Sequence, residues 1–208
     1  MVFRSFLATA VFGLMAGGAL AQSSLSDITA QLDARASEMA QVEALLADAD
    51  AGRRLAAMEL LIKSGNPVYA KRATEVGIFS SDVELQRAAL RAVFDAGGPF
   101  RILINYGGST DEQNGVKSWI GGEGSWDDTT KRATYIFRTQ PFDEKRQCWP
   151  FAESSNCAFR MVGSTVSIDE WSYAVGSFQL DTTGQLVGDF RYSAGNHLPV
   201  PATIPIVE

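Results

Sequence analysis

The chain has 208 residues, with 18 lysines and arginines against 24 aspartates and glutamates, so its formal net charge is −6. This acidic balance opposes nonspecific attraction to nucleic acid and to anionic membranes, and we expect neither as a partner. The single histidine, His197, excludes an H-E-x-x-H site and every zinc site that needs several histidines.

The start of the chain predicts export. One early cation, Arg4, precedes an apolar or small run over residues 6–20 that ends in Ala19-Leu20-Ala21. These features are typical of a secretory signal peptide, here residues 1–21. The alternative is a transmembrane anchor, but that would need ~20 apolar residues, and this run is shorter. We therefore expect a soluble product that is periplasmic or secreted, with no stable membrane insertion after the signal is cleaved.

Composition divides the remainder into two parts. Residues 22–96 contain three glycines and three aromatics, whereas the chain from Gly97 onward contains thirteen glycines and fifteen aromatics. Ala, Leu and Glu favour helix in the first part, while aromatic, β-branched and turn residues favour antiparallel sheet in the second. The predicted fold class is α+β: a helical region over residues 22–97, followed by an antiparallel β-sandwich or barrel-like domain over residues 98–208.

The first predicted helix carries a heptad stripe. Apolar residues recur every seven positions, at Leu25, Leu32, Met39 and Leu46, and a second column offset by three begins at Ile28. A long amphipathic helix of about six turns fits this pattern, with Ser24 or Ser26 as its N-cap. Two uses of the stripe stay open: packing on the helices that follow, or a homodimer through residues 25–49.

An internal repeat follows at an offset of 32 residues. Residues of like kind correspond: Asp50 and Asp82, Ala56-Ala57 and Ala88-Ala89, Met58 and Leu90, Leu61 and Val93, Ile62 and Phe94, Gly65 and Gly97. Each copy is predicted as a helix capped by Asp and ended by Gly, with a shorter helix from Pro67 to Val76 between them.

The order of Asp, basic residue, Ala-Ala, Leu and final Gly resembles the HEAT-type helical repeat family over residues 50–97. The resemblance implies a small α-solenoid fragment of the kind that this family uses for protein contacts. The alternative is that these helices only cap the sheet domain.

Short strands are predicted through the second part. Their residue ranges are 100–106, 116–120, 132–139, 158–162, 164–168, 175–180 and 185–192. The last two flank Asp181-Thr-Thr-Gly184, a strong signal for a tight hairpin. Gly107–Gly115 is predicted as a surface loop with no helix after it. The proline-containing tail, residues 198–207, is expected to be an extended edge or wrap and not a central strand.

The two cysteines, Cys148 and Cys157, are an even pair in a chain predicted to be exported, so we expect a disulfide between them. A redox pair or a metal site would require C-x-x-C spacing or a nearby histidine, and neither is present in this stretch. The pair is therefore interpreted as structural.

Catalytic motifs are absent from the sequence. It contains no G-x-S-x-G elbow and no Ser-x-x-Lys pair, and the Gly107–Gly115 loop lacks the lysine of a phosphate-binding loop. We expect no catalytic residues, no bound metal and no cofactor, and we interpret His197 as a loop histidine.

Acids that lie near tryptophans are the remaining candidates for a ligand site. Loop or strand-end acids (Glu123, Asp127, Asp128, Asp169 and Glu170) lie close in sequence to three tryptophans. Aromatic platforms beside acids suit a sugar, and two carboxylates across a cleft suffice for glycoside cleavage. The candidate ligand-binding residues are therefore Trp119, Trp126, Trp171, Asp127 and Asp128. The alternative is that they are turn acids and core tryptophans.

Taken together, these features favour an exported, soluble cell-envelope protein that acts as a non-enzymatic protein-interaction module. The alternative function is a carbohydrate-binding, or less readily a carbohydrate-cleaving, envelope protein whose partner is a glycan. A dimerising structural protein is the third hypothesis.

Overall fold

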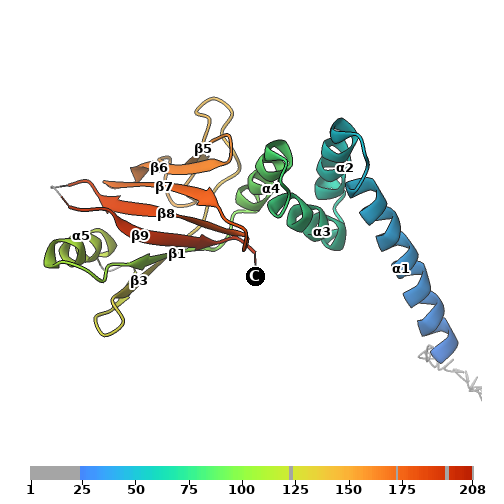
Figure 1. Cartoon of the computed structure of the whole chain (residues 1–208), viewed down its shortest axis with the longest axis horizontal. Coiled ribbons are helices and arrows are strands. Elements are labelled where there is room, and N and C mark those ends of the chain that lie inside the picture. The colour runs from blue at the N-terminus through green and yellow to red at the C-terminus, as the bar shows by residue number, and fades with distance from the viewer. Residues whose placement is uncertain (1–23, 122–123, 172, 195–196, 208) are drawn as a thin grey trace, which may run out of the picture. The chain divides into compact units, whose positions relative to one another are not determined.

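A computed structural model describes residues 24–121, 124–171, 173–194 and 197–207 (Figure 1). The predicted signal peptide lies outside the described residues. The chain divides into two compact units, the first ending at Glu38 and the second starting at Met39. None of the helices in the described ranges is both long enough and apolar enough to cross a membrane.

The first helix, α1 (Leu25–Leu46), is the long helix that the heptad stripe predicts. Its N-cap is Ser24, whose hydroxyl accepts a hydrogen bond from the backbone N–H of Asp27 at 3.2 Å. The side chains of Val42 and Leu46, in the part of α1 that belongs to the second unit, are buried. Leu25, in the first unit, is 80% exposed. Burial therefore reaches only the C-terminal part of the stripe.

Three further helices form the rest of the helical region: α2 (Ala51–Lys63), α3 (Pro67–Ile78) and α4 (Val83–Asp95). Asp50 accepts the backbone N–H of Arg53 at 2.8 Å, and Asp82 accepts that of Glu84 at 2.9 Å, so both predicted caps are confirmed. The 32-residue repeat in the sequence thus corresponds to α2 and α4.

Close helix packing depends on Gly77 in α3. A Cβ added at this position would lie 2.6 Å from the Cβ of Ala89 in α4 and 2.8 Å from the Cε of Met58 in α2. Real carbon atoms do not approach so closely, so only glycine allows the three helices to meet here.

The second part is a curled antiparallel sheet, and the predicted α+β fold class is confirmed. Its described strands have the order β2-β3-β1-β9-β8-β7-β6-β5-β4. Their bounds are β1 (Phe100–Asn105), β2 (Ser125–Asp127), β3 (Arg132–Phe137), β4 (Trp149–Pro150), β5 (Cys157–Val162), β6 (Thr165–Trp171), β7 (Ala174–Leu180), β8 (Gln185–Tyr192) and β9 (Val200–Pro205). Thr139, beyond β3, forms a bridge with Phe151, beyond β4, so the sheet curls into a half-barrel in which the segments after these two strands meet.

An aromatic core joins α4 to the inner face of the sheet. Phe94 of α4 is fully buried, and its ring centroid lies 4.9 Å from that of Phe159 and 5.1 Å from those of Phe100 and Trp149. Thr139 donates its hydroxyl to the carbonyl of Phe94 at 2.7 Å. The helix is thus held to the sheet by both apolar packing and a buried hydrogen bond.

A fifth helix, α5 (Thr110–Ile120), occupies the stretch for which a loop and a short strand are predicted. That prediction is wrong because Ser109 and Glu112 form a capping box: Glu112 donates its N–H to the Ser109 hydroxyl at 3.3 Å, and Ser109 donates its N–H to the Glu112 carboxylate at 2.6 Å. Val116 and Ile120 are then buried. In Figure 1, α5 and α4 lie at opposite ends of the strands.

The proline-containing tail is also mispredicted, since β9 is a central strand between β8 and β1. It pairs with β8 along its whole length, but with β1 only at Ala202 and Thr203. Pro201 and Pro205 therefore flank the short ladder with β1, where a missing amide removes no hydrogen bond from that ladder.

Candidate functional site

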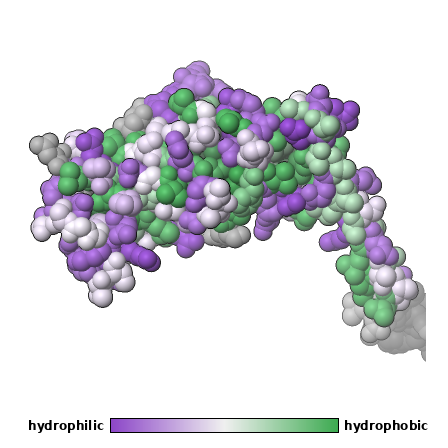
Figure 2. Space-filling model, in the orientation of Figure 1, coloured by the Kyte–Doolittle hydropathy of each residue, from purple (hydrophilic) through white to green (hydrophobic). Residues whose placement is uncertain are grey.

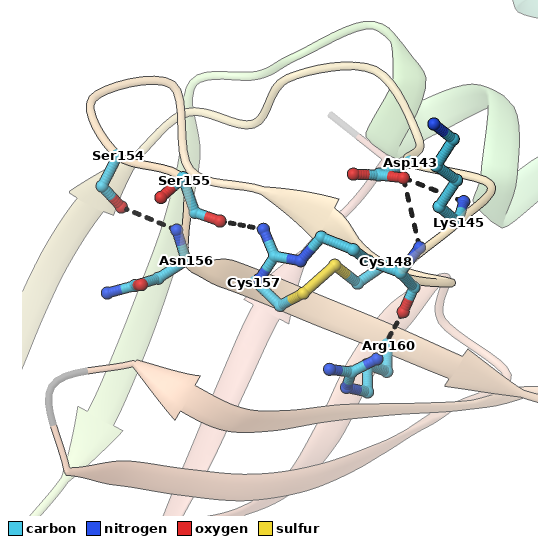
Figure 3. Close-up of a disulfide and its surroundings, with 9 residues drawn as sticks. Asp143, Lys145, Cys148, Ser154, Ser155, Asn156, Cys157 and Arg160 are labelled. Atoms are coloured by element: carbon cyan, nitrogen blue, oxygen red, sulfur yellow. Dashed lines mark hydrogen bonds between the residues drawn. A yellow bond between two sulfur atoms is a disulfide. The ribbon is translucent and has the colours of Figure 1, made fainter.

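The predicted disulfide between Cys148 and Cys157 is present, and both residues are fully buried (Figure 3). Hydrogen bonds hold the loop around it: Arg146 donates to the carbonyl of Ser155, and Arg160 donates to the carbonyl of Arg146 at 2.6 Å. Because both sulfurs are buried among bonded loop residues, the bridge serves as a structural link between β4 and β5.

Trp119 belongs to the core and not to an open platform. It lies in α5, is half-buried, and its ring centroid is 4.5 Å from that of Phe190 and 4.8 Å from that of Tyr135. These are inner-face residues of β8 and β3. Trp119 therefore agrees with the alternative interpretation, in which the tryptophans belong to the core.

Four other candidates lie wholly or partly outside the described residues. Trp171 lies in β6, but its side chain and those of Asp169 and Glu170 are outside the described residues, as is the whole of Glu123.

Trp126 is the exposed tryptophan among the described candidates, with 43% of its surface accessible, and it lies on the edge strand β2. Asp128, two residues after Trp126, accepts hydrogen bonds from the Lys117 ammonium at 2.5 Å and from the Tyr106 hydroxyl at 3.3 Å. Trp126, Asp127 and Asp128 of the predicted set are consecutive residues at this edge, and the structure places Lys117 and Tyr106, which the sequence did not single out, in contact with Asp128.

The two aspartates of this edge are both ionised at neutral pH. The hydroxyl of Thr130 lowers the pKa of Asp127, and the Lys117 ammonium lowers the pKa of Asp128. Burial raises the pKa of the adjacent Tyr106 phenol, with the Asp128 charge adding to the effect. Glycoside cleavage needs a carboxylic acid that stays protonated, and neither aspartate has this property. These two carboxylates are suited to accept hydrogen bonds from a polar ligand.

His197 connects the start of α5 to the segment before β9. Its Nδ1 lies 3.1 Å from the Asp111 carboxylate, and its ring stacks on Tyr192 at 5.6 Å between centroids. A Cβ added to Gly115 would lie 2.9 Å from the histidine ring, so the glycine makes room for it. His197 lies in a loop, as predicted, and its contacts with Asp111 and Tyr192 were not evident from the sequence.

The outward face of the sheet has two grooves that sequence reasoning missed. One of about 520 Å³ is lined by side chains of β3, β1, β9 and β8, including Leu103, Arg132, Thr134, Gln185 and Thr203. The other, of about 420 Å³, includes Ser167, Val175, Ser177, Asp189 and Arg191. Alternation along single strands indicated which residues face outward, but only the strand order makes them neighbours.

A third groove, of about 550 Å³, lies between α2, α3 and α4 and the segment that ends β9. Its lining is mainly apolar, including Ile62, Val93 and Ile206, and Lys71 and Glu75 at its edge are 3.9 Å apart. We interpret it as the seam where the helices meet the sheet.

Comparison of the chain with protein-family models, with curated proteins and with solved structures found no match.

Proposed function

We propose that the chain is an exported, soluble protein of the cell envelope that acts as a non-enzymatic protein-interaction module. The observation that carries the proposal is the apolar stripe of α1: Leu25 is 80% exposed, Leu32 62% and Ile28 45%. Covering a leucine fully contributes about 1.5–3 kcal/mol, so a partner on this stripe would gain several kcal/mol. Figure 2 shows hydrophobic residues, in green, gathered along α1.

The C-terminal turns of α1 are anchored, which supports a role in presenting the stripe. Val42 and Leu46 are buried, and the guanidinium of Arg72 in α3 forms a two-pronged ion pair with the Glu43 carboxylate, the second contact being 3.0 Å. The HEAT-type resemblance of residues 50–97 supports the same function, because that repeat serves as a base for protein contacts.

The export part of the proposal rests on the signal-peptide pattern of residues 1–21, and the Cys148–Cys157 disulfide supports an oxidising compartment. Mass spectrometry of the protein recovered from the periplasm or medium should give a chain that begins at Gln22. Retention of the intact chain in the cytoplasm would contradict export.

Site-specific photo-crosslinking tests the interaction surface. A photoreactive phenylalanine analogue is placed at Leu32, within the stripe, or at Ala30, which is also exposed but lies about 200° away around the helix. We expect the Leu32 position to give a defined crosslinked protein species and the Ala30 position to give none. Equal crosslinking at both positions, or no crosslink at either, would contradict the proposal.

Binding of a glycan is the second candidate function, and it is favoured by the exposed Trp126, which lies two residues before the Asp128 that pairs with Lys117. An indole face beside charged hydrogen-bonding groups is a suitable platform for a sugar ring. Peptidoglycan or polysaccharide fragments should change the tryptophan fluorescence of the wild-type chain, and Trp126→Ala should remove this change while Trp126→Phe retains binding. A response that survives Trp126→Ala would exclude this site.

A further inference from the structure

Within the part of the second unit that the structure describes, the outward face of the half-barrel has exposed apolar side chains at its centre. Ile136 of β3 is 58% exposed, Val187 of β8 44% and Leu103 of β1 39%. The helices packed on the sheet contact its inner face instead, α4 through Phe94 and α5 through Trp119. Exposed apolar groups on adjacent strands mark a surface that a further element can cover.

Guanidinium groups surround this apolar centre. Arg132 lines the larger outer groove and Arg191 the smaller one, and within the described residues neither makes an ion pair or a side-chain hydrogen bond. Two acids share this face: Asp127 of β2 lies opposite Arg132 in the strand register, and Asp189 lines the smaller groove. Arg101 of β1 also lies on this face, so cationic groups are concentrated around β3 and β1, and this region fits a partner that combines apolar side chains with carboxylates.

The N-terminal part of α1 has the complementary composition. Beside the exposed Leu25, Ile28 and Leu32 it carries three acids, Asp27, Asp33 and Glu38, against one cation, Arg35. Asp33 is exposed and makes no ion pair with any other described residue. Pairing of two α1 stripes with each other is disfavoured, because it would bring like charges together and place Arg35 in the heptad core.

The two surfaces also match in size. Residues 24–38 form a helical segment about 20 Å long, from a rise of 1.5 Å per residue. The four strands β3, β1, β9 and β8 are neighbours in the sheet and together are about 15–20 Å wide, from a spacing of roughly 4.8 Å. A helix laid across these strands can thus reach from the Arg132 side to Val187.

We propose that α1 of one copy of this chain binds the outer sheet face of a second copy. Leu25, Ile28 and Leu32 cover the apolar centre of that face, and Asp33 approaches its Arg132. The contact is heterologous, and reciprocal exchange of two helices gives a closed dimer. The inference rests on the proposed interaction function and names its partner.

Sedimentation velocity of the chain from Gln22 to Glu208 provides the test, over micromolar to millimolar concentrations. The wild type should associate reversibly. Asp33→Arg and Arg132→Glu should each weaken self-association by about five- to tenfold, because each places like charges across the contact. An equal mixture of the two variants should recover wild-type affinity, since every helix then meets a face of opposite charge.

Matched controls carry the same charge changes elsewhere. Glu153→Arg and Lys145→Glu alter exposed loop residues and should leave association unchanged. All variants should keep the far-UV circular dichroism and the unfolding midpoint of the wild type, which shows that they are folded.

Three outcomes would overturn the inference. A monomeric wild type throughout the concentration range would do so, as would association that Leu32→Ser abolishes but Arg132→Glu leaves unchanged. A mixture of Asp33→Arg with Arg132→Glu that fails to recover affinity is the third. None of these outcomes removes the proposed interaction function, because stripe-specific crosslinking at Leu32 to a different protein would remain its separate support.

Discussion

Truncation of Phe94 tests whether the helices α2–α4 and the sheet unfold as one cooperative unit. The side chain is fully buried and its ring centroid lies within 5.1 Å of those of three aromatic rings from the strands β1, β4 and β5. Phe→Ala changes at such sites cost about 3–5 kcal/mol, through lost burial and the cavity left behind. Against a total stability of about 5–15 kcal/mol, Phe94→Ala should lower the melting temperature by about 6–20 °C.

Urea unfolding followed by two signals gives the assay. All four tryptophans lie after Gly98, so fluorescence reports the sheet region, whereas far-UV circular dichroism is dominated by the helices. The two unfolding midpoints should coincide in the wild type and should fall together in Phe94→Ala. The control Leu60→Ala alters a side chain that is 71% exposed on α2, and it should change the free energy of unfolding by less than about 0.5 kcal/mol.

Separation of the two signals would refute this reasoning. If Phe94→Ala shifted only the circular dichroism and left the fluorescence midpoint unchanged, the helical region 22–97 would unfold independently of the sheet. The predicted division at Gly97 would then be a thermodynamic boundary, and the aromatic cluster would be a weak contact between domains.

Three further predictions concern the disulfide, the helix packing at Gly77 and the carboxylate of Asp181. Replacing both Cys148 and Cys157 by alanine should lower the free energy of unfolding by about 2.5–3 kcal/mol, the loop-entropy value for a bridge with a sequence separation of 9, and the reducing agent that shifts the wild-type urea midpoint should leave that of the variant unchanged. Gly77→Ala should destabilise by about 1–3 kcal/mol because its Cβ would overlap α4, whereas Gly52→Ala, with its nearest atom at 3.3 Å, should leave the melting temperature equal or raise it. A backbone hydrogen bond from Gln185 lowers the pKa of Asp181 in the folded chain, so its contribution to stability is present above the unfolded pKa and is lost as the pH falls through the folded pKa; unfolding free energies measured from neutral pH to below about pH 4 should decrease less steeply for Asp181→Asn than for the wild type, and equal slopes would contradict this assignment.

The features that the sequence predicted correctly are encoded over short distances. The α1 stripe, the Asp50 and Asp82 caps and the hairpin around Asp181 each depend on residues within one or two turns of each other. The disulfide needed only two cysteines and a predicted compartment. The helix α5 was encoded in the same way, by the Ser-x-x-Glu signal at Ser109, but its glycine and asparagine content concealed it.

Other features were decided by tertiary structure. The cost of a proline in a strand depends on which neighbours need its amide, and β9 is central because its two-residue ladder with β1 lies between Pro201 and Pro205. Likewise Trp119 and Trp126 are close in sequence and equal in chemistry. The fold covers Trp119 with the inner-face rings of Tyr135 and Phe190 and leaves Trp126 on the edge strand. Local sequence patterns thus specify helices, turns and the cysteine pair. The outer face around Arg132 depends on strand order instead, because side chains from distant strands become neighbours only when the sheet is formed.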